Sequence, residues 1–325
     1  MKISSWVQEK LGRRFVIGVP YIWLLVFFVL PFLILLRISV TDMGNGVDPF
    51  APLIETVGGS WKIMLRFHNY ASIFSDTTPG TIGLARLADV WAGLGNTIYM
   101  EAYKTSLRYA MLTTVFCLAI GYPFAYFIAR ARPAIRPALL MLVMLPFWTS
   151  FLLRVYAWKG ILADQGVLNN LLMWLGITKE PIIMMYTDIS MLVGMTYVYC
   201  PFMILPLYAT LVKMDNRLLE AAHDLGASAW KAFWLITVPL SKSGIIAGSM
   251  LVFIPSVGEF VIPSLLGGAE NITIGRVVWD EMFSSNNWPR ASALAVVMIL
   301  LILVPLAFYY RANATRDARD GRGGH

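Results

Sequence analysis

Residues 215–239, DNRLLEAAHDLGASAWKAFWLITVP, form a charged stretch with turn signals between long hydrophobic segments. Asp215 can cap a first helix, because its carboxylate can accept from the free backbone N–H groups of the first turn. Gly226 falls at the end of that helix, where glycine adopts the left-handed conformation without a Cβ clash. Ser228 can cap a second helix, which Pro239 interrupts. The stretch therefore predicts two short helices around a glycine corner.

The first of these helices has an apolar face. Leu218, Leu219, Ala222 and Leu225 recur at i, i+1, i+4 and i+7, which places them on one side of a helix. An amphipathic hairpin held between membrane segments has a suitable shape for docking a soluble protein. The alternative is a polar connector without a binding role.

The composition of the chain indicates an all-α integral membrane protein. Hydrophobic residues make up 58% of the sequence and charged residues 14%, and several apolar runs reach the length that crosses a bilayer. A transmembrane barrel is excluded, because barrels show short alternating segments. The formal net charge is +7, but the basic residues lie at the edges of the apolar runs, so nucleic acid is not an expected partner.

Cysteine and histidine give no sign of a metal or another cofactor. Cys117 and Cys200 each lie inside an apolar run and are far apart, so neither a disulfide framework nor a metal spacing exists. His68, His223 and His325 are scattered along the chain. We therefore expect no cofactor.

Six apolar segments predict six transmembrane helices. We expect Pro201 and Pro206 to break the fourth of them. Residues 167–175 are expected to form a short interfacial helix, and the connection 37–101 a small ordered cap. The six segments cover residues 15–36, about 103–129, 139–158, 189–212, 243–266 and 291–310.

The distribution of Lys and Arg predicts the orientation of these spans. Most of them lie in the N-terminal residues 1–14, the loop after the second span, the surroundings of the hairpin and the tail 311–325. Short loops rich in Lys and Arg stay on the cytoplasmic side. Both termini and the 215–239 hairpin are therefore expected in the cytoplasm, and the 37–101 connection in the periplasm.

The hairpin also carries a family signature. Glu220-Ala221-Ala222, followed by Gly226, Ile236 and Pro239, resembles the EAA–G–I–P pattern of bacterial ABC importer permeases. Four longer blocks are similar to permease subunits of putrescine and spermidine uptake systems, the putrescine type above all. They are PYIWLLVFFVLPFLILLRIS (20–39), LPFWTSFLLRVYAWKGIL (145–162), YVYCPFMILPLYATL (197–211) and GSMLVFIPSVGEFVIPSLLGG (248–268).

This resemblance implies a type I ABC importer permease fold, with residues 102–310 as its core. It also implies four kinds of partner in the inner membrane and beside it: a second, homologous permease, two copies of a cytoplasmic ATPase, a periplasmic polyamine-binding protein and the lipid bilayer. Transport would proceed by alternating access. Carried over to this sequence, the contact with the ATPase falls on Glu220, Ala221, Ala222, Gly226 and Pro239.

Glu259 is the candidate for contact with a cationic substrate. It is the only acidic residue deep in a predicted span, and an intramembrane ionisable residue is a functional candidate by default. Pro255, Gly258 and Pro263 around it predict a broken helix that lines a cavity. The alternative is a structural ion pair between Glu259 and Arg154.

Aromatic residues near the span ends are further candidates for the substrate path. An aromatic face attracts an ammonium group by about 0.5–2 kcal/mol. The alternative is an interfacial belt, where aromatic residues gather at both membrane surfaces. The residues concerned are Trp148, Tyr156, Trp158, Tyr197 and Tyr199.

Other functions fit the sequence less well. No H-E-x-x-H pattern or pair of intramembrane carboxylates supports an intramembrane enzyme, so we expect no catalytic residue. No G-x-x-x-x-G-K-[ST] loop is present, so ATP hydrolysis is expected in a separate subunit. A permease of the same class for an opine-type amino acid, ferric iron or sulfate stays open as an alternative. A channel or secondary carrier is a further one, although no inverted repeat is found.

Overall fold

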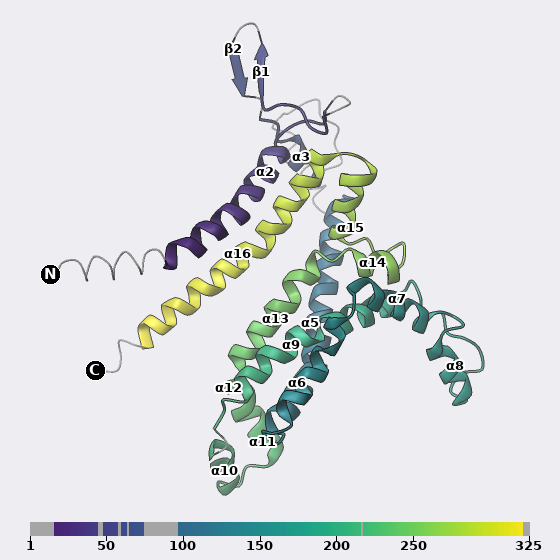
Figure 1. Ribbon diagram of the computed structural model, residues 1–325, viewed down its shortest axis with the longest axis vertical. Coiled ribbons are helices and arrows are strands. Elements are labelled where there is room, and N and C mark those ends of the chain that lie inside the picture. The colour runs from purple at the N-terminus through teal and green to yellow at the C-terminus, as the bar shows by residue number, and fades with distance from the viewer. Residues whose placement is uncertain are drawn as a thin grey trace, which may run out of the picture. The chain divides into compact units, whose positions relative to one another are not determined.

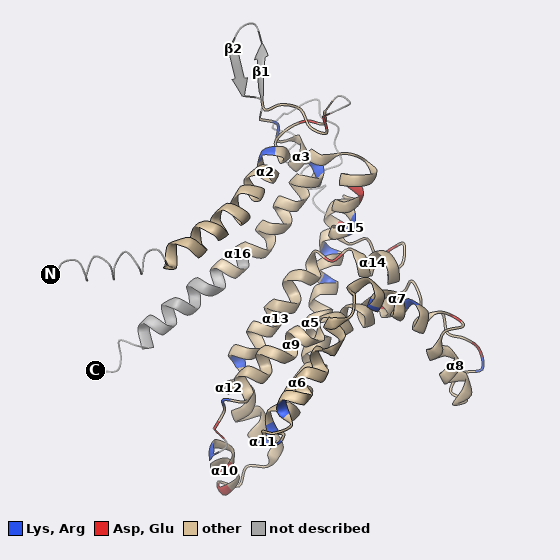
Figure 2. Ribbon diagram, viewed as in Figure 1, with Lys and Arg blue, Asp and Glu red and all other residues tan. Residues whose placement is uncertain are grey.

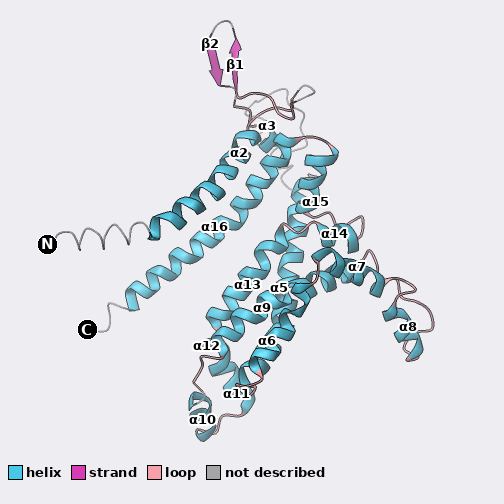
Figure 3. Cartoon of the chain, in the orientation of Figure 1, coloured by secondary structure: helices cyan, strands magenta, loops and turns pink. Residues whose placement is uncertain are grey.

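The computed structural model describes residues 16–44, 48–57, 60–63, 65–74, 97–215 and 217–320. The chain divides into two compact units. Unit 1 comprises Met1–Thr97 and Val278–His325, and unit 2 comprises Ile98–Val277. Helices dominate both units (Figure 3).

Unit 1 is built on two long helices. The apolar helix Val16–Ser39 contains a π-helical turn, η1 (Leu25–Val29), and ends as α2 (Leu30–Ser39). It packs against α16 (Trp288–Asp320), which also contacts the short α3 (His68–Phe74) (Figure 1). The amide of Asn69 donates to the carbonyl oxygens of Ser39 at 3.1 Å and Thr41 at 2.8 Å, so α3 secures the end of α2. A π-helical turn, η4 (Asp280–Ser284), precedes α16.

A small antiparallel hairpin departs from the all-helical expectation. Its strands are β1 (Ile54–Val57) and β2 (Ser60–Ile63), with Ile54 opposite Ile63 and Val57 opposite Ser60. It lies in the predicted connection 37–101, of which residues 75–96 lie outside the described part. Over the residues that the structure describes, the fold is therefore mostly helical with one two-stranded hairpin.

A charged cluster follows α2 in the same connection. The guanidinium of Arg66 pairs with the carboxylate of Asp42, and His68 Nδ1 lies 3.4 Å from the other carboxylate oxygen. Burial lowers the pKa of His68, and the positive charges of Arg290 and Arg66 lower it further. The lowered pKa favours the neutral form of His68.

Unit 2 contains the helices that position the candidate sites. Three long ones, α5 (Ile98–Arg130), α9 (Asp188–Leu211) and α13 (Lys242–Val257), pack against one another in every pair. Gly248 of α13 permits one close approach, since a Cβ there would lie 2.8 Å from the sulfur of Met203. Small residues at such crossings let membrane helices approach closely. The remaining elements are α6 (Arg136–Met144), η2 (Leu145–Trp148), α7 (Phe151–Leu162), α8 (Val167–Trp174), α10 (Arg217–Asp224), α11 (Ala229–Ala232), η3 (Phe233–Thr237), α12 (Val238–Leu240), α14 (Val261–Leu266) and α15 (Ile274–Trp279).

The third predicted span is not one straight helix. The segments Arg136–Trp148 and Phe151–Trp174 meet at an angle of 89°. Pro146 lies in the 3₁₀ turn before the corner, and Thr149 and Ser150 have extended backbones that end the helical hydrogen bonding. The span expected over 139–158 therefore contains a sharp bend, and it stays a prediction that the two segments cross the membrane together. A helix at the expected 167–175 is confirmed as α8.

The fourth predicted span is continuous, contrary to the expected break. Pro201 and Pro206 both lie inside α9 without interrupting it. The neighbouring helices α5 and α13 both pack against α9 and support it. Membrane helices tolerate proline where neighbouring helices and hydroxyl groups compensate for the lost backbone bond.

Length and composition mark three helices as able to cross a membrane: Val16–Ser39, Ile98–Arg130 and Asp188–Leu211. The number rises to five if each bent pair counts as one span, the second pair being Ala229–Leu240 with Lys242–Val257. Trp288–Leu303 is a shorter apolar helix. Among the described residues, the membrane-protein class is therefore confirmed, and the number six stays a prediction.

Candidate functional site

The first candidate site is the hairpin between α9 and α13. Oδ1 of Asp215 accepts the backbone N–H of Arg217 at 3.0 Å, as expected of a residue that starts a helix. Gly226 has φ +79°, and the backbone N–H of Ala227 bonds the Ala222 carbonyl at 2.9 Å, which closes α10. The predicted glycine corner is therefore present.

The second helix of the hairpin starts as predicted and ends slightly later. The hydroxyl oxygen of Ser228 accepts from the backbone N–H of Lys231 at 3.4 Å and caps α11. The helix passes through the π-helical turn η3 and continues past Pro239 to Leu240. Pro239 follows closely on this π-helical turn and has no N–H to donate to it.

The signature residues of the hairpin divide into a buried and an exposed set. Ala222 is 8% exposed, whereas Glu220, Ala221 and Pro239 are exposed. Leu225, beside the corner, is 88% exposed, although it belongs to the predicted apolar face. Large exposed apolar side chains next to charged ones are typical of a surface that binds another protein.

An aromatic cluster joins this hairpin to the bundle. The ring of Phe233 lies edge-on to Tyr122 and Tyr126 of α5, with centroid separations of 5.5 and 5.9 Å. The hydroxyl groups of Tyr122 and Ser241 lie 2.8 Å apart. Edge-to-face pairs contribute about 0.5–1.5 kcal/mol beyond their buried area. The periodicity of the hairpin did not reveal Phe233 as an anchor, because its partners lie on another helix.

The hairpin end of unit 2 is rich in basic residues. Figure 2 shows Lys and Arg near α6, α11 and α12, at the end where the α5–α6 turn and the hairpin lie. The same figure shows acidic residues on α10, the helix that carries Glu220 and Asp224.

The second candidate site is the gap between α13 and α14, where the predicted helix break is confirmed. Glu259 is half-buried in this gap, which runs from Gly258 to Phe260. Its Oε1 accepts the backbone N–H groups of Val261 at 3.0 Å and Ile262 at 3.4 Å. Its Oε2 accepts the hydroxyl of Tyr199 on α9. The carboxylate therefore has partners on both oxygens.

The structural ion pair considered for Glu259 is absent. Arg154 is 9% exposed, and its Nε and Nη1 have no hydrogen-bond partner in the described part of the chain. Its guanidinium lies over the rings of Phe147 at 5.1 Å and Phe151 at 5.8 Å. The structure thus holds the Arg154 charge by cation–π contacts, and Glu259 has a different set of partners.

The predicted aromatic residues do not form one set. Tyr199 is buried and bonds Glu259, whereas Trp148 and Tyr156 are exposed. Trp158 and Tyr197 form a T-shaped pair with a centroid separation of 5.4 Å. Only Tyr199 thus touches the candidate carboxylate.

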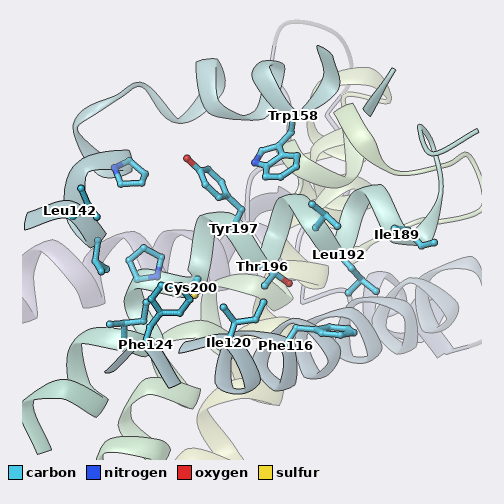
Figure 4. A pocket seen from close by; sticks show the side chains of 15 residues that line it. Phe116, Ile120, Phe124, Leu142, Trp158, Ile189, Leu192, Thr196, Tyr197 and Cys200 are labelled. Atoms are coloured by element: carbon cyan, nitrogen blue, oxygen red, sulfur yellow. The ribbon is translucent and has the colours of Figure 1, made fainter. Parts of the chain in front are cut away.

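Trp158 and Tyr197 border a cavity of about 670 Å³ in unit 2. Figure 4 shows this pair on one side and Phe116, Ile120 and Phe124 of α5 on the other. Thr196 and Cys200 add small polar groups, but no carboxylate lines the cavity. An ammonium group without a counter-charge is costly in such surroundings. The cavity therefore fits an apolar occupant better than a cation, and the candidate cation site stays at Glu259.

A family model and a curated relative both match this chain over more than half of its length. The family model described as "Binding-protein-dependent transport system inner membrane component" matches residues 118–316. The spermidine/putrescine transport system permease protein PotB of Haemophilus influenzae is 37% identical over 302 residues, which cover 93% of this chain and 94% of that protein.

Two solved structures share the fold. One is a bacterial ABC transporter involved in the import of the acidic polysaccharide alginate, with a TM-score of 0.60 and 16% identity over 95% of this chain and 98% of that one. The other is a bacterial alginate ABC transporter in complex with an alginate pentasaccharide-bound periplasmic protein. Its TM-score is 0.59 at 17% identity, over 93% of this chain and 94% of that one.

Proposed function

This chain belongs to the binding-protein-dependent transport system inner membrane components, and we propose that it is a permease subunit of an ABC importer for polyamines. The observation that carries the proposal is the similarity to a spermidine/putrescine permease over nearly the full length of both chains. A match of this extent includes both the hairpin and the segment around Glu259. Putrescine is the proposed substrate, with spermidine as the second choice.

The proposed topology has six spans with both termini in the cytoplasm. The long helices and the two bent pairs supply five candidates, and the apolar part of α16 supplies the sixth. The basic residues at the hairpin end of unit 2 support a cytoplasmic position for that end.

The hairpin is proposed to transmit the work of a separate ATPase. Its exposed residues Glu220, Ala221 and Leu225 would enter a groove of that subunit, and the Gly226 corner would set the angle of approach. Phe233 would pass the movement on to α5 through Tyr122 and Tyr126. Together with a second, homologous permease, the chain would alternate between outward-open and inward-open states, with substrate delivered by a periplasmic binding protein.

Glu259 is proposed to meet an ammonium group of the substrate inside the membrane. Its carboxylate lies at a helix break, where irregular backbone at membrane depth is tolerated if it lines a cavity or is buried in protein. Tyr199 and the backbone of α14 hold this carboxylate in place while no cation is bound. A passing ammonium would replace the Tyr199 hydroxyl as its partner.

The function is tested in proteoliposomes that contain the complete complex, with its ATPase subunits and binding protein. ATP hydrolysis is measured with putrescine, spermidine, sulfate, ferric iron and an opine-type amino acid in separate samples. We expect a polyamine to stimulate hydrolysis and the other ligands to leave it at its basal rate. Stimulation by one of the others instead would refute the polyamine assignment while keeping the family.

The role of Glu259 is tested with Glu259→Gln, which keeps the size and the acceptor oxygen but removes the charge. Polyamine uptake should fall by about tenfold or more, because a charge-assisted contact contributes about 1.5–3 kcal/mol. Glu180→Gln is the matched control, since Glu180 is an exposed acid in the connection between α8 and α9. Wild-type uptake by an assembled Glu259→Gln complex would rule the role out.

A further inference from the structure

A second carboxylate lies at the opposite end of α9 from the hairpin. Asp188 is the first residue of α9, and its Oδ1 accepts from the amide of Asn271 at 3.0 Å. Oδ1 of that same Asn271 accepts the hydroxyl of Tyr109 on α5 at 2.8 Å. The cluster therefore joins α5, α9 and the turn between α14 and α15, three segments that lie far apart in the sequence (Figure 1).

The position of this carboxylate is fixed by the surrounding turns. The hydroxyl of Ser190 donates to the Leu266 carbonyl oxygen at 2.7 Å and ties the start of α9 to the end of α14. Gly268, just after α14, packs so closely against the residues before α9 that a Cβ there would lie 2.5 Å from the carbonyl oxygen of Tyr186. Asp188 is thus presented on a packed corner of the fold.

The second oxygen of Asp188 faces a cation of the protein itself. Arg108 Nη2 lies 3.9 Å from Oδ2, and the Arg108 guanidinium lies 5.8 Å from the centroid of the Tyr109 ring. Both distances are near the upper limit of such contacts. The side chains of Arg108 and Asp188 are 68% and 50% exposed, so solvent screens the pair.

A carboxylate beside an aromatic face is the combination that recognises an organic cation. In this structure the Tyr109 ring is only 2% exposed, and the guanidinium of Arg108 holds the place beside it through one long ion pair and one long ring contact. A soluble dication that arrives at this corner can displace it, because an exposed ion pair of this kind contributes little.

On the basis of the proposed function, we propose that Asp188 and Tyr109 form an outer receiving site for a polyamine ammonium group, with Arg108 as the competing internal cation. Asp188 and Tyr199 are 11 residues apart on α9, which corresponds to about 16 Å along the helix. This spacing exceeds the length of a diamine with a four-carbon chain. The substrate would therefore meet the carboxylates of Asp188 and Glu259 one after the other.

The experiment compares two variants with opposite expected effects on polyamine uptake by the complete complex. Asp188→Asn keeps an oxygen that accepts from Asn271 but removes the charge, and we expect the KM to rise about threefold, as fits a charge contact at a half-exposed carboxylate. Arg108→Gln removes the competing cation, and we expect the KM to fall about threefold. The binding protein is supplied at one fixed concentration, so that the delivery step is the same throughout. Asp164→Asn, at an exposed acid between α7 and α8, is the matched control and should leave the KM unchanged.

Each outcome decides for or against the outer site. A rise for Asp188→Asn together with a fall for Arg108→Gln supports it, while equal losses in both variants show a structural role and overturn it. An unchanged KM in both overturns it as well, with the polyamine assignment intact. If Asp188→Asn fails to assemble, the KM of Arg108→Gln decides alone: a lower KM supports the outer site, and an unchanged or higher KM overturns it. A wild-type complex that no polyamine stimulates removes the proposed function and the outer site together.

Discussion

The hairpin of α10 and α11 and the gap that holds Glu259 differ in how their polar and apolar groups are satisfied. At the hairpin, Leu225 and Trp230 are largely exposed, and Glu220 is exposed beside them. At the gap, both oxygens of Glu259 have partners within the chain. The hairpin therefore presents apolar side chains that the chain itself does not cover, whereas the carboxylate in the gap has its partners within the chain.

This difference implies two modes of action. An exposed apolar surface gains free energy when a partner covers it, so the hairpin can bind without rearranging. A satisfied carboxylate has to exchange one of its partners before it binds a cation, so the gap can bind only by competition. The same logic holds at Asp188, where Arg108 is the partner to be displaced.

The largest expected effect belongs to the corner of the hairpin. Gly226→Val places a side chain at φ +79°, which costs about 1–2 kcal/mol and changes the angle between the two helices. Uptake and substrate-stimulated ATP hydrolysis should both fall about tenfold or more. Both are measured on the reconstituted complex.

The chain offers a matched control for this substitution. Gly176 has φ +70°, and like Gly226 it has no atom within 4 Å of an added Cβ. Gly176→Val should therefore carry similar strain and leave uptake within about twofold of wild type. Gly226→Asn should recover function, since asparagine tolerates the left-handed region. Equal losses at the two glycines would show that strain alone, and not the docking angle, is responsible.

An intermediate effect is expected at the exposed apolar surface. Leu225→Asp removes no internal packing, because the side chain is 88% exposed. It should weaken the association with the ATPase about tenfold, since burying a leucine contributes about 1.5–3 kcal/mol. The measurement is the amount of ATPase that co-purifies with the permease. The control is Ile177→Asp, which makes a similar change at a residue beyond α8 that is 66% exposed. If this variant loses as much co-purifying ATPase as Leu225→Asp does, the loss is not specific to the hairpin.

The smallest effect is expected at the satisfied carboxylate. Tyr199→Phe removes the hydroxyl that bonds Glu259 but leaves the backbone bonds from α14. The KM for polyamine uptake should fall about threefold, because the substrate no longer competes with this hydroxyl. Tyr197→Phe, two residues earlier and in the Trp158 pair, is the control. A higher KM for Tyr199→Phe would mean that the hydroxyl helps to bind the substrate.

Much of the hairpin was predictable because its signals are local. The carboxylate of Asp215, the missing Cβ of Gly226 and the hydroxyl of Ser228 act on backbone groups within a few residues. The helix break beside Glu259 was predictable for the same reason. The exposure of Leu225 was not, because periodicity identifies a helix face without showing whether the chain itself covers it.

Proline signals were a less reliable guide. Pro201 and Pro206 predicted a break in α9 that packing against α5 and α13 prevents. The sharp corner after Trp148 had only a weak signal in Pro146, which stands before it. A proline alone therefore does not determine whether a helix continues.

The sequence by itself determined the membrane class, the glycine corner of the hairpin and the presence of an acid at a broken span. These depend on hydropathy and on contacts between near neighbours in the chain. The tertiary structure decided which partners these polar groups have. Glu259 is bonded by Tyr199 and not by Arg154, and Asn271 bonds both Asp188 and Tyr109. Such pairs join residues 60 to 162 positions apart. They form only when helix packing sets which faces of the helices meet.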